Sequence, residues 1–162
     1  MENDKSALQA KVEELTAESS SELDQVKSIY YWVQDNIRYI AFEDGIAGFQ
    51  PDNCQNVFKN KYGDCKGMAN LTKEMLTLAG FDARLTLIGT NHIAFDYSTP
   101  SLAVDNHMIC TVLLDGKKYF LDPTEKYNPF SEYAERIQGQ QALIEDGENY
   151  LLERVPVMSK QD

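Results

Sequence analysis

The chain has 162 residues, enough for one domain with its own apolar core, and its 43% hydrophobic and 25% charged residues are typical of globular proteins. Its net charge of −11, with no run of lysine or arginine, excludes the basic face that nucleic-acid binding requires. Three irregularly spaced cysteines make no disulfide framework, and no apolar run approaches the roughly 20 residues of a membrane span.

The N-terminal end is charged and has no apolar segment of the kind that a signal peptide carries. We therefore expect a cytoplasmic protein if the chain is complete. If it is a piece of a longer protein, the compartment stays open, the extracytoplasmic space included. Residues 1–20 are predicted as a lead-in helix or linker, 21–158 as one domain and 159–162 as a tail. The lead-in helix is suggested by the helical spacing of Leu8, Val12 and Leu15.

Two amphipathic helices follow this segment. The first is expected to begin at Ser21, which with Asp24 three residues later resembles a capping box. The second spans about residues 65–79 and ends before Gly80, a residue suited to the left-handed position after a helix. Between them, "FEDGIAGFQPDN" at residues 42–53 carries closely spaced turn-forming residues and predicts a loop. The apolar face of the first helix consists of Leu23, Val26, Ile29, Tyr30, Val33 and Ile37.

The rest of the chain favours strands. "DARLTLIGT" is strand-like, and "NHMICTVLLDGKKYFLDPT" contains two β-prone runs around Asp115-Gly116, among the strongest hairpin signals. A second Asp-Gly hairpin, "QALIEDGENYLLERV", closes the domain. Helices followed mostly by hairpin-connected strands indicate an α+β fold with an antiparallel sheet.

Cys65 is a candidate nucleophile because it stands where a Gly-Asp turn runs into the second helix. With Asp64 as the N-cap, the thiol lies in the first turn, where the helix dipole favours the thiolate. The same position also suits a small buried residue, which is the more common role of a cysteine at a helix start. Taken alone, the position leaves both roles open.

The first hairpin supplies a candidate base and its partner. If Asp115-Gly116 is a two-residue turn, the register counted outward from it sets Ile109 opposite Asp122. His107 then lies diagonal to Asp122 on the same face, within reach of a bond between imidazole and carboxylate. A three-residue turn would direct the two side chains to opposite faces. Together with the cysteine, this pair indicates a nucleophile, a base and an orienting acid.

The stretches "YGDCKGMANLTKEMLTLAGFDA" and "DNHMICTVLLDGKKYFLDPT" resemble the transglutaminase-like superfamily of papain-type thiol enzymes. The resemblance is greatest to the bacterial branch with a Gly-Asp-Cys-Lys motif at the nucleophile, and it covers about residues 24–125. It implies a papain-like fold, with the catalytic helix packed on an antiparallel sheet, and a catalytic triad of Cys65, His107 and Asp122. It also implies a protein or peptide amide as substrate, and a place for this domain within a longer multidomain chain.

Neither a metal ion nor another cofactor is expected. Animal transglutaminases carry a tryptophan directly after the nucleophile, where this chain has Lys66, and the sequence contains no calcium-site pattern. His107 and Cys110 are three residues apart, which on a strand directs their side chains to opposite faces and not to one zinc ion. An oxyanion would need hydrogen-bond donors, and the backbone N–H of Cys65 can supply one. Gln50 in "GFQP" is the candidate for a second donor, from its side chain. A loop glutamine that faces solvent is an equal alternative for this residue.

The expected reaction is thiol-dependent amide cleavage or acyl transfer, of cysteine peptidase, amidase or transglutaminase type. Hydrolysis is favoured because it needs no apparatus to keep water from a thioester. The alternative from another class is a catalytically silent transglutaminase-like interaction module within a larger protein. Retention of all three triad residues favours an enzyme.

Overall fold

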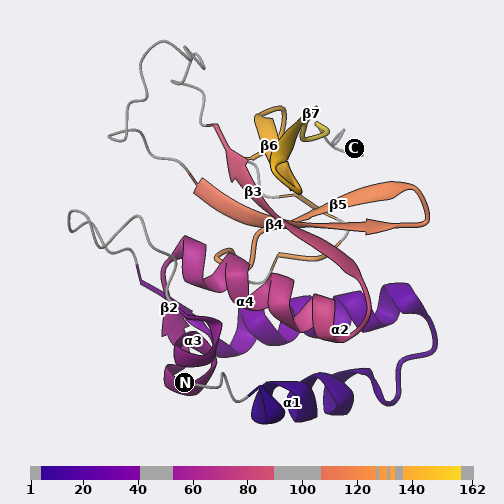
Figure 1. Ribbon diagram of the computed structural model, residues 1–162, viewed down its shortest axis with the longest axis vertical. Coiled ribbons are helices and arrows are strands. Elements are labelled where there is room, and N and C mark those ends of the chain that lie inside the picture. Colours follow the sequence, from indigo (N-terminus) through magenta and orange to yellow (C-terminus); the bar gives the residue numbers. More distant parts are fainter. Residues whose placement is uncertain are drawn as a thin grey trace.

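The computed structural model describes residues 5–40, 53–89, 107–126, 128–130, 132–133 and 137–157. In this part of the chain, helices lie against one face of a curled antiparallel sheet (Figure 1). The helices are α1 (Ser6–Thr16), α2 (Glu22–Asn36), α3 (Cys54–Asn60) and α4 (Cys65–Leu78). The sheet has the order β5-β4-β3-β6-β7. Its strands are β3 (Asp82–Ile88), β4 (His107–Leu114), β5 (Lys117–Leu121), β6 (Gln141–Asp146) and β7 (Asn149–Arg154).

Helix α2 begins where the sequence predicts. Ser21 is the N-cap, and its hydroxyl accepts a hydrogen bond from the backbone N–H of Asp24 at 3.1 Å. The Asp24 carboxylate accepts the Ser20 hydroxyl at 2.6 Å, one residue before the position that a capping box uses. Ser21 therefore caps the helix, and Ser20 adds a side-chain hydrogen bond to the first turn.

Helix α4 also follows its prediction closely. It begins at Cys65 and ends at Leu78, one residue before the predicted end. Gly80 has a φ of +95°, the left-handed conformation that favours glycine after a helix. The helix packs against β3 and β4 on one side and against α2 on the other. Its position under the sheet is what carries Cys65 to the start of β4.

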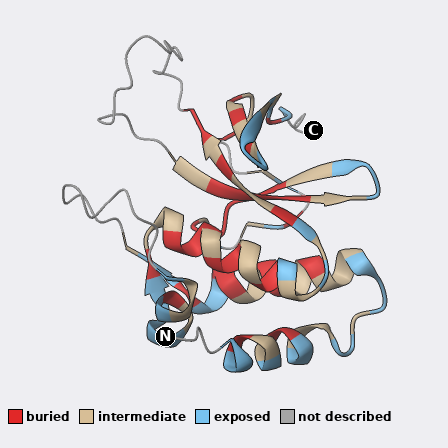
Figure 2. Cartoon of the chain, in the orientation of Figure 1, coloured by how far each residue is buried: buried red, intermediate tan, exposed pale blue. Residues whose placement is uncertain are grey.

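Apolar residues cover both faces of the sheet. The larger core lies between the sheet and the helices, and Figure 2 shows buried residues along α4 and the neighbouring strands. Leu8 and Val12 of α1 belong to this core, so the predicted lead-in segment packs against the other helices. A smaller core covers the opposite face around Ile109, Phe120 and Ile144. Burial on both faces explains why β4 is a largely apolar run without alternating polar residues.

Both predicted hairpins are present, but they use their Asp-Gly pairs differently. In the β4–β5 turn, Asp115 and Gly116 have φ values of 51° and 76°, as expected for a type I′ turn. In the β6–β7 turn, Asp146 pairs with Asn149, so Gly147, with a φ of 63°, takes the first central position. The turn is therefore placed one residue later relative to Asp-Gly in the second hairpin.

The structure adds elements that the sequence analysis did not predict. Helix α3 precedes α4, and β1 (Arg38–Tyr39) pairs in parallel with β2 (Tyr62–Gly63). This short pair joins the end of α2 to the residues directly before α4. The predicted α+β architecture with an antiparallel sheet is confirmed.

Some predictions fall on parts of the chain that the structure does not describe. The predicted loop at residues 42–53 lies outside the described residues except for Asn53, and the predicted tail at residues 159–162 lies outside them entirely. Across the described ranges, no helix combines the length and the apolar character needed to cross a membrane.

Candidate active site

The start of α4 holds the thiol of Cys65 in a fixed place. The Asp64 carboxylate accepts the backbone N–H of Gly67 at 2.7 Å, as expected of an N-cap aspartate. Just before it, the Ile40 backbone N–H donates to the Gly63 carbonyl oxygen at 2.9 Å and ties this part of the chain to the residue that follows β1. Cys65 is thus at the first helical position, whose backbone N–H has no acceptor within the helix.

The β4–β5 hairpin brings His107 and Asp122 together. The ladder runs in the predicted register as far as Cys110, which pairs with Leu121. His107 Nε2 and Asp122 Oδ2 are 2.6 Å apart, and the two side chains are 11% and 1% exposed. They therefore make the contact that the spacing predicts, shielded from water, while their catalytic roles remain predictions.

The other oxygen of the Asp122 carboxylate is held by Thr124. Oδ1 accepts the Thr124 hydroxyl at 2.6 Å and the Thr124 backbone N–H at 3.1 Å. Both donors belong to the Asp-Pro-Thr turn that follows β5. A carboxylate buried this deeply needs such partners, because leaving water without them is unfavourable.

Helix α2 supports the same turn through a buried polar network. The Tyr30 hydroxyl donates to the Asp122 carbonyl oxygen at 3.4 Å. Gln34 Nε2 donates to the Tyr30 hydroxyl and to the Asn128 carbonyl oxygen, both at 3.2 Å. Tyr30 and Gln34 are each 2% exposed, and burial raises the pKa of Tyr30 above its usual value. The network joins α2 to the chain on both sides of the turn.

The Cys65 thiol makes hydrogen bonds with the His107 side chain and with the backbone of Met108. Burial of the thiol raises its pKa, but these two bonds and the charge of the imidazole outweigh burial, so the pKa of Cys65 lies below its ordinary value. The Asp64 carboxylate acts in the opposite direction. Since Nε2 of His107 faces Asp122, Nδ1 is the ring nitrogen left for the thiol.

The other two cysteines have different surroundings. Cys110 is completely buried in β4, and burial raises its pKa to about 12. Cys54 is half-buried at the start of α3, where burial also raises its pKa. Within the described ranges, His, Cys, Asp and Glu side chains form no group of three that could hold a metal ion. Gln50, the predicted oxyanion donor, lies outside the described residues.

Sequence reasoning missed two contributors to this site. Thr124 could have been found, because a hydroxyl two residues after an aspartate is well placed to bond its carboxylate in a turn. Met108 gave no signal, because it acts through its backbone N–H and any residue but proline supplies that donor.

A thiol at a helix start, an imidazole on an adjoining strand and a carboxylate behind the imidazole are the arrangement of papain-like thiol proteins. The family model of the transglutaminase-like superfamily matches residues 9–122, which include all three side chains. The chain belongs to the transglutaminase-like superfamily.

Three solved structures share the fold, which is papain-like as predicted. A candidate protease from Parabacteroides distasonis ATCC 8503 has a TM-score of 0.71 and 17% identity, over 96% of this chain and 28% of that one. A candidate cysteine protease from Cytophaga hutchinsonii has a TM-score of 0.58 and 16% identity, over 75% of this chain and 38% of that one. A TGase has a TM-score of 0.53 and 20% identity, over 80% and 34%.

The chain spans between 28% and 38% of the length of these three structures, so it corresponds to one part of each. No curated protein matches the chain in sequence.

Proposed function

We propose that this domain is a thiol enzyme that cleaves an amide bond, or transfers its acyl group, through Cys65, His107 and Asp122. The observation that carries the proposal is one continuous line of hydrogen bonds, from the Cys65 thiol through His107 to Asp122. A lowered thiol pKa beside an imidazole is what a nucleophilic cysteine needs, and membership of the superfamily supports the same chemistry.

In the proposed first step, Cys65 gives its proton to Nδ1 of His107, and the thiolate attacks the carbonyl carbon of the substrate. A carbon–sulfur bond forms, and the carbonyl oxygen becomes an oxyanion. The tetrahedral intermediate then breaks its carbon–nitrogen bond, and His107 returns the proton to the leaving amine. Asp122 holds the ring in the required tautomer throughout. A thioester on Cys65 remains.

The second step decides the type of enzyme. Water that gives its proton to His107 can attack the thioester, which releases a carboxylic acid and restores the thiol. A primary amine in place of water gives a new amide, as in a transglutaminase. We favour hydrolysis of a protein or peptide amide, because transfer additionally requires that water be kept from the thioester.

The oxyanion needs donors as well. The backbone N–H of Cys65 is one, since the first helical position leaves it available. We propose the side chain of Gln50 as the second, by its place upstream of the nucleophile in the sequence.

The first experiment measures how fast iodoacetamide alkylates each cysteine as the pH is varied, with mass spectrometry to separate the three sites. Cys65 should react at a lower pH than Cys54, and Cys110 should stay protected. In His107→Ala, the midpoint for Cys65 should rise, because a bond that lowers its pKa is lost while burial remains. In urea, where the fold is absent, all three cysteines should react alike.

The same profiles separate an enzyme from a silent interaction module. The proposal would be contradicted, and the silent module favoured, if the pH midpoint of Cys65 alkylation in the folded protein equalled that of an unfolded thiol. The same conclusion would follow if His107→Ala left this midpoint unchanged. If the midpoint is low, turnover is measured next. Release of new amino ends from a protein substrate reports hydrolysis, and incorporation of a fluorescent amine reports transfer. Cys65→Ala is the negative control for both assays.

A further inference from the structure

A row of apolar side chains crosses the sheet next to the candidate active site. The register aligns Met108 with Leu87, Leu87 with Leu143, and Leu143 with Leu152. Directly paired residues of neighbouring strands project from the same face of a sheet. These four side chains therefore form one row across β4, β3, β6 and β7, which we call the leucine row.

One end of the leucine row adjoins the nucleophile. The Met108 backbone hydrogen-bonds to the Cys65 thiol, so the row starts where a substrate carbonyl would react. Three strand spacings of about 4.8 Å carry the row about 14 Å from there to Leu152. An extended peptide rises about 3.3 Å per residue, so about four residues span the row.

The leucine row stands apart from the apolar cores of the described fold. Neither of the two apolar cores that the described residues form includes any of its four side chains. Leu87, Met108 and Leu143 are half-buried, and Leu152 is 56% exposed. Surface area of this kind next to a reactive site is typical of a binding surface.

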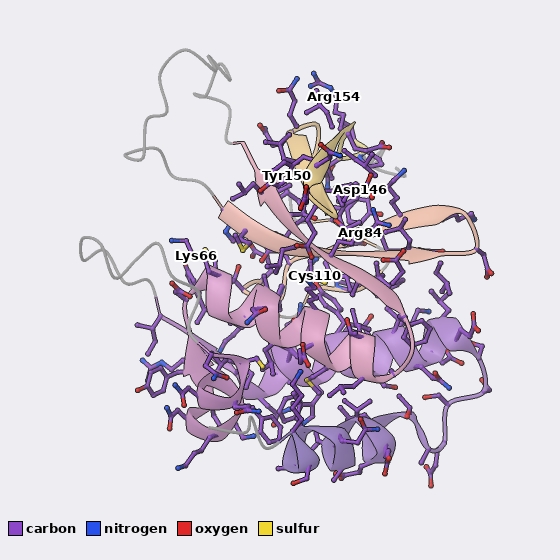
Figure 3. All side chains as sticks on the ribbon, in the orientation of Figure 1. Lys66, Arg84, Cys110, Asp146, Tyr150 and Arg154 are labelled. Carbon is purple, nitrogen blue, oxygen red and sulfur yellow. The ribbon has the colours of Figure 1, made fainter. Side chains whose placement is uncertain are left out.

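The neighbours of the row show which part of this sheet face α4 covers. Glu145 lies on the same face of β6, two residues beyond Leu143, and its carboxylate pairs with Lys73 of α4. Tyr150 lies on β7, where it pairs with Glu145 of β6, and it is 64% exposed. Figure 3 shows Tyr150 at the β6–β7 end of the sheet, on the far side of the sheet's middle strands from α4. Helix α4 thus reaches the sheet at Glu145 of β6. The row extends one strand further, to Leu152 of β7, which is exposed.

We propose that the leucine row binds the acyl donor, an extended peptide with apolar side chains near the reacting carbonyl group. The inference rests on the proposed function, because it is the thiol at one end that makes this face a place for a substrate. Alternate side chains of an extended peptide point to the same side. Apolar residues two and four positions from the carbonyl would therefore pack on the row, and polar residues there would leave it in water.

The test compares how fast electrophilic peptides alkylate Cys65. Peptidyl chloromethyl ketones extend from the reactive carbon in one chain direction, and iodoacetyl peptides extend in the other. Each is made with Leu or with Ser at the second and fourth positions, and each rate is divided by the iodoacetamide rate of the same variant. In the wild-type protein, the Leu reagent should be about tenfold faster than the Ser reagent in at least one direction.

Two substitutions in the row should reduce this preference. Leu143→Thr and Leu152→Thr each keep a strand-forming residue, and each should lower the Leu-over-Ser ratio about three- to tenfold without changing the iodoacetamide rate. Leu152 is exposed, so its replacement leaves both cores intact. The matched control is Leu113→Thr, a half-buried leucine of β4 outside both cores whose side chain projects from the opposite face, and it should keep the wild-type ratio.

The outcomes separate this inference from the proposed function. If iodoacetamide reacts with Cys65 no faster than with an unfolded thiol, the proposed function fails, and the role of the row as a substrate site fails with it. If iodoacetamide is fast but neither peptide direction prefers Leu, only the leucine-row proposal is overturned. The same holds if the preference survives both row substitutions or is lost equally in Leu113→Thr.

Discussion

Asp122 divides its carboxylate between two partners. Oδ2 meets the imidazole of His107, and Oδ1 is tied to the hydroxyl and the backbone N–H of Thr124. If the Asp122 carboxylate were bonded only at Oδ2, it could rotate about its Cβ–Cγ bond. The imidazole of His107 would then lose its fixed orientation. In the proposed mechanism, Thr124 is therefore a positioning residue, which acts on His107 through Asp122.

Replacement of Thr124 by valine tests this role, since valine has a similar shape but no hydroxyl. A hydrogen bond to a charged group contributes about 1.5–3 kcal/mol, so Thr124→Val should lower kcat by about 10- to 100-fold with little change in KM. Thr124→Ser restores the hydroxyl and should recover most of the loss. The readouts are steady-state kinetics and the pH profile of Cys65 alkylation. Normal values of both in Thr124→Val would mean that the hydroxyl serves only the turn.

At the scale of the element, the N-cap of α4 has two opposing effects on the thiol. The Asp64 carboxylate caps the helix through the backbone N–H of Gly67, which stabilises the helix start. Its negative charge also raises the pKa of Cys65, against the effect of His107. Stability and reactivity therefore depend on different properties of one side chain, its oxygen acceptor and its charge.

Two substitutions at Asp64 separate these properties. Asp64→Asn keeps an acceptor for Gly67 and removes the charge, so the free energy of unfolding should change little while the pKa of Cys65 falls further. Asp64→Ala loses the acceptor too and should cost about 1 kcal/mol of stability, with a similar fall in pKa. Urea denaturation and the alkylation profile measure the two effects. Equal destabilisation by Asn and Ala would show that charge stabilises the helix, and an unmoved profile would show that the charge does not act on the thiol.

The elements that could be predicted from the sequence are those with local signals. Helix α4 has an amphipathic repeat between an aspartate cap and a glycine, and the β4–β5 hairpin has Asp-Gly between two β-prone runs. Helix α3 is too short to show a period, and β1 pairs with a strand that is distant in sequence. Neither leaves a pattern that reading along the chain can find.

The contacts of the candidate site also fall into those with a local sequence signal and those without one. The contact between His107 and Asp122 follows from counting residues around one turn, so the sequence was sufficient for it. The bond from the Met108 backbone to Cys65 depends on how α4 docks against β4, beyond the last pair of the β4–β5 ladder. The tertiary packing that decides this is not encoded in any short motif.

At the scale of the whole molecule, the central core contains a group that can ionise. Cys110 lies completely buried between the sheet and the helices, and its pKa rises from 9.0 to about 12. Between these pH values the unfolded chain has lost a proton that the folded chain keeps, so stability falls as the pH rises. The slope that this one group contributes is at most about 1.4 kcal/mol per pH unit.

Cys110→Ala should remove that slope. The variant should be less stable at neutral pH because of the cavity it leaves, and its stability should then decline less steeply than wild type between pH 9 and 12. Val112→Ala is the matched control, since it makes a cavity in the same core without removing a titratable group. Urea unfolding over this pH range measures all three proteins. A wild-type slope in Cys110→Ala would show that burial of this thiol does not govern alkaline stability.

The strand pairings also indicate where the chain tolerates change over evolution. Tyr39 pairs with Gly63, and Ile88 pairs with His107, so the two ends of each intervening stretch are neighbours in the fold. Insertions and deletions between such closed ends cost little in loop entropy, and they leave the register on either side unchanged. The first of the two stretches carries Gln50. Family members can therefore diverge in both stretches while the thiol and the imidazole keep their positions. Under the proposed function, substrate choice and bond-breaking chemistry could then evolve separately.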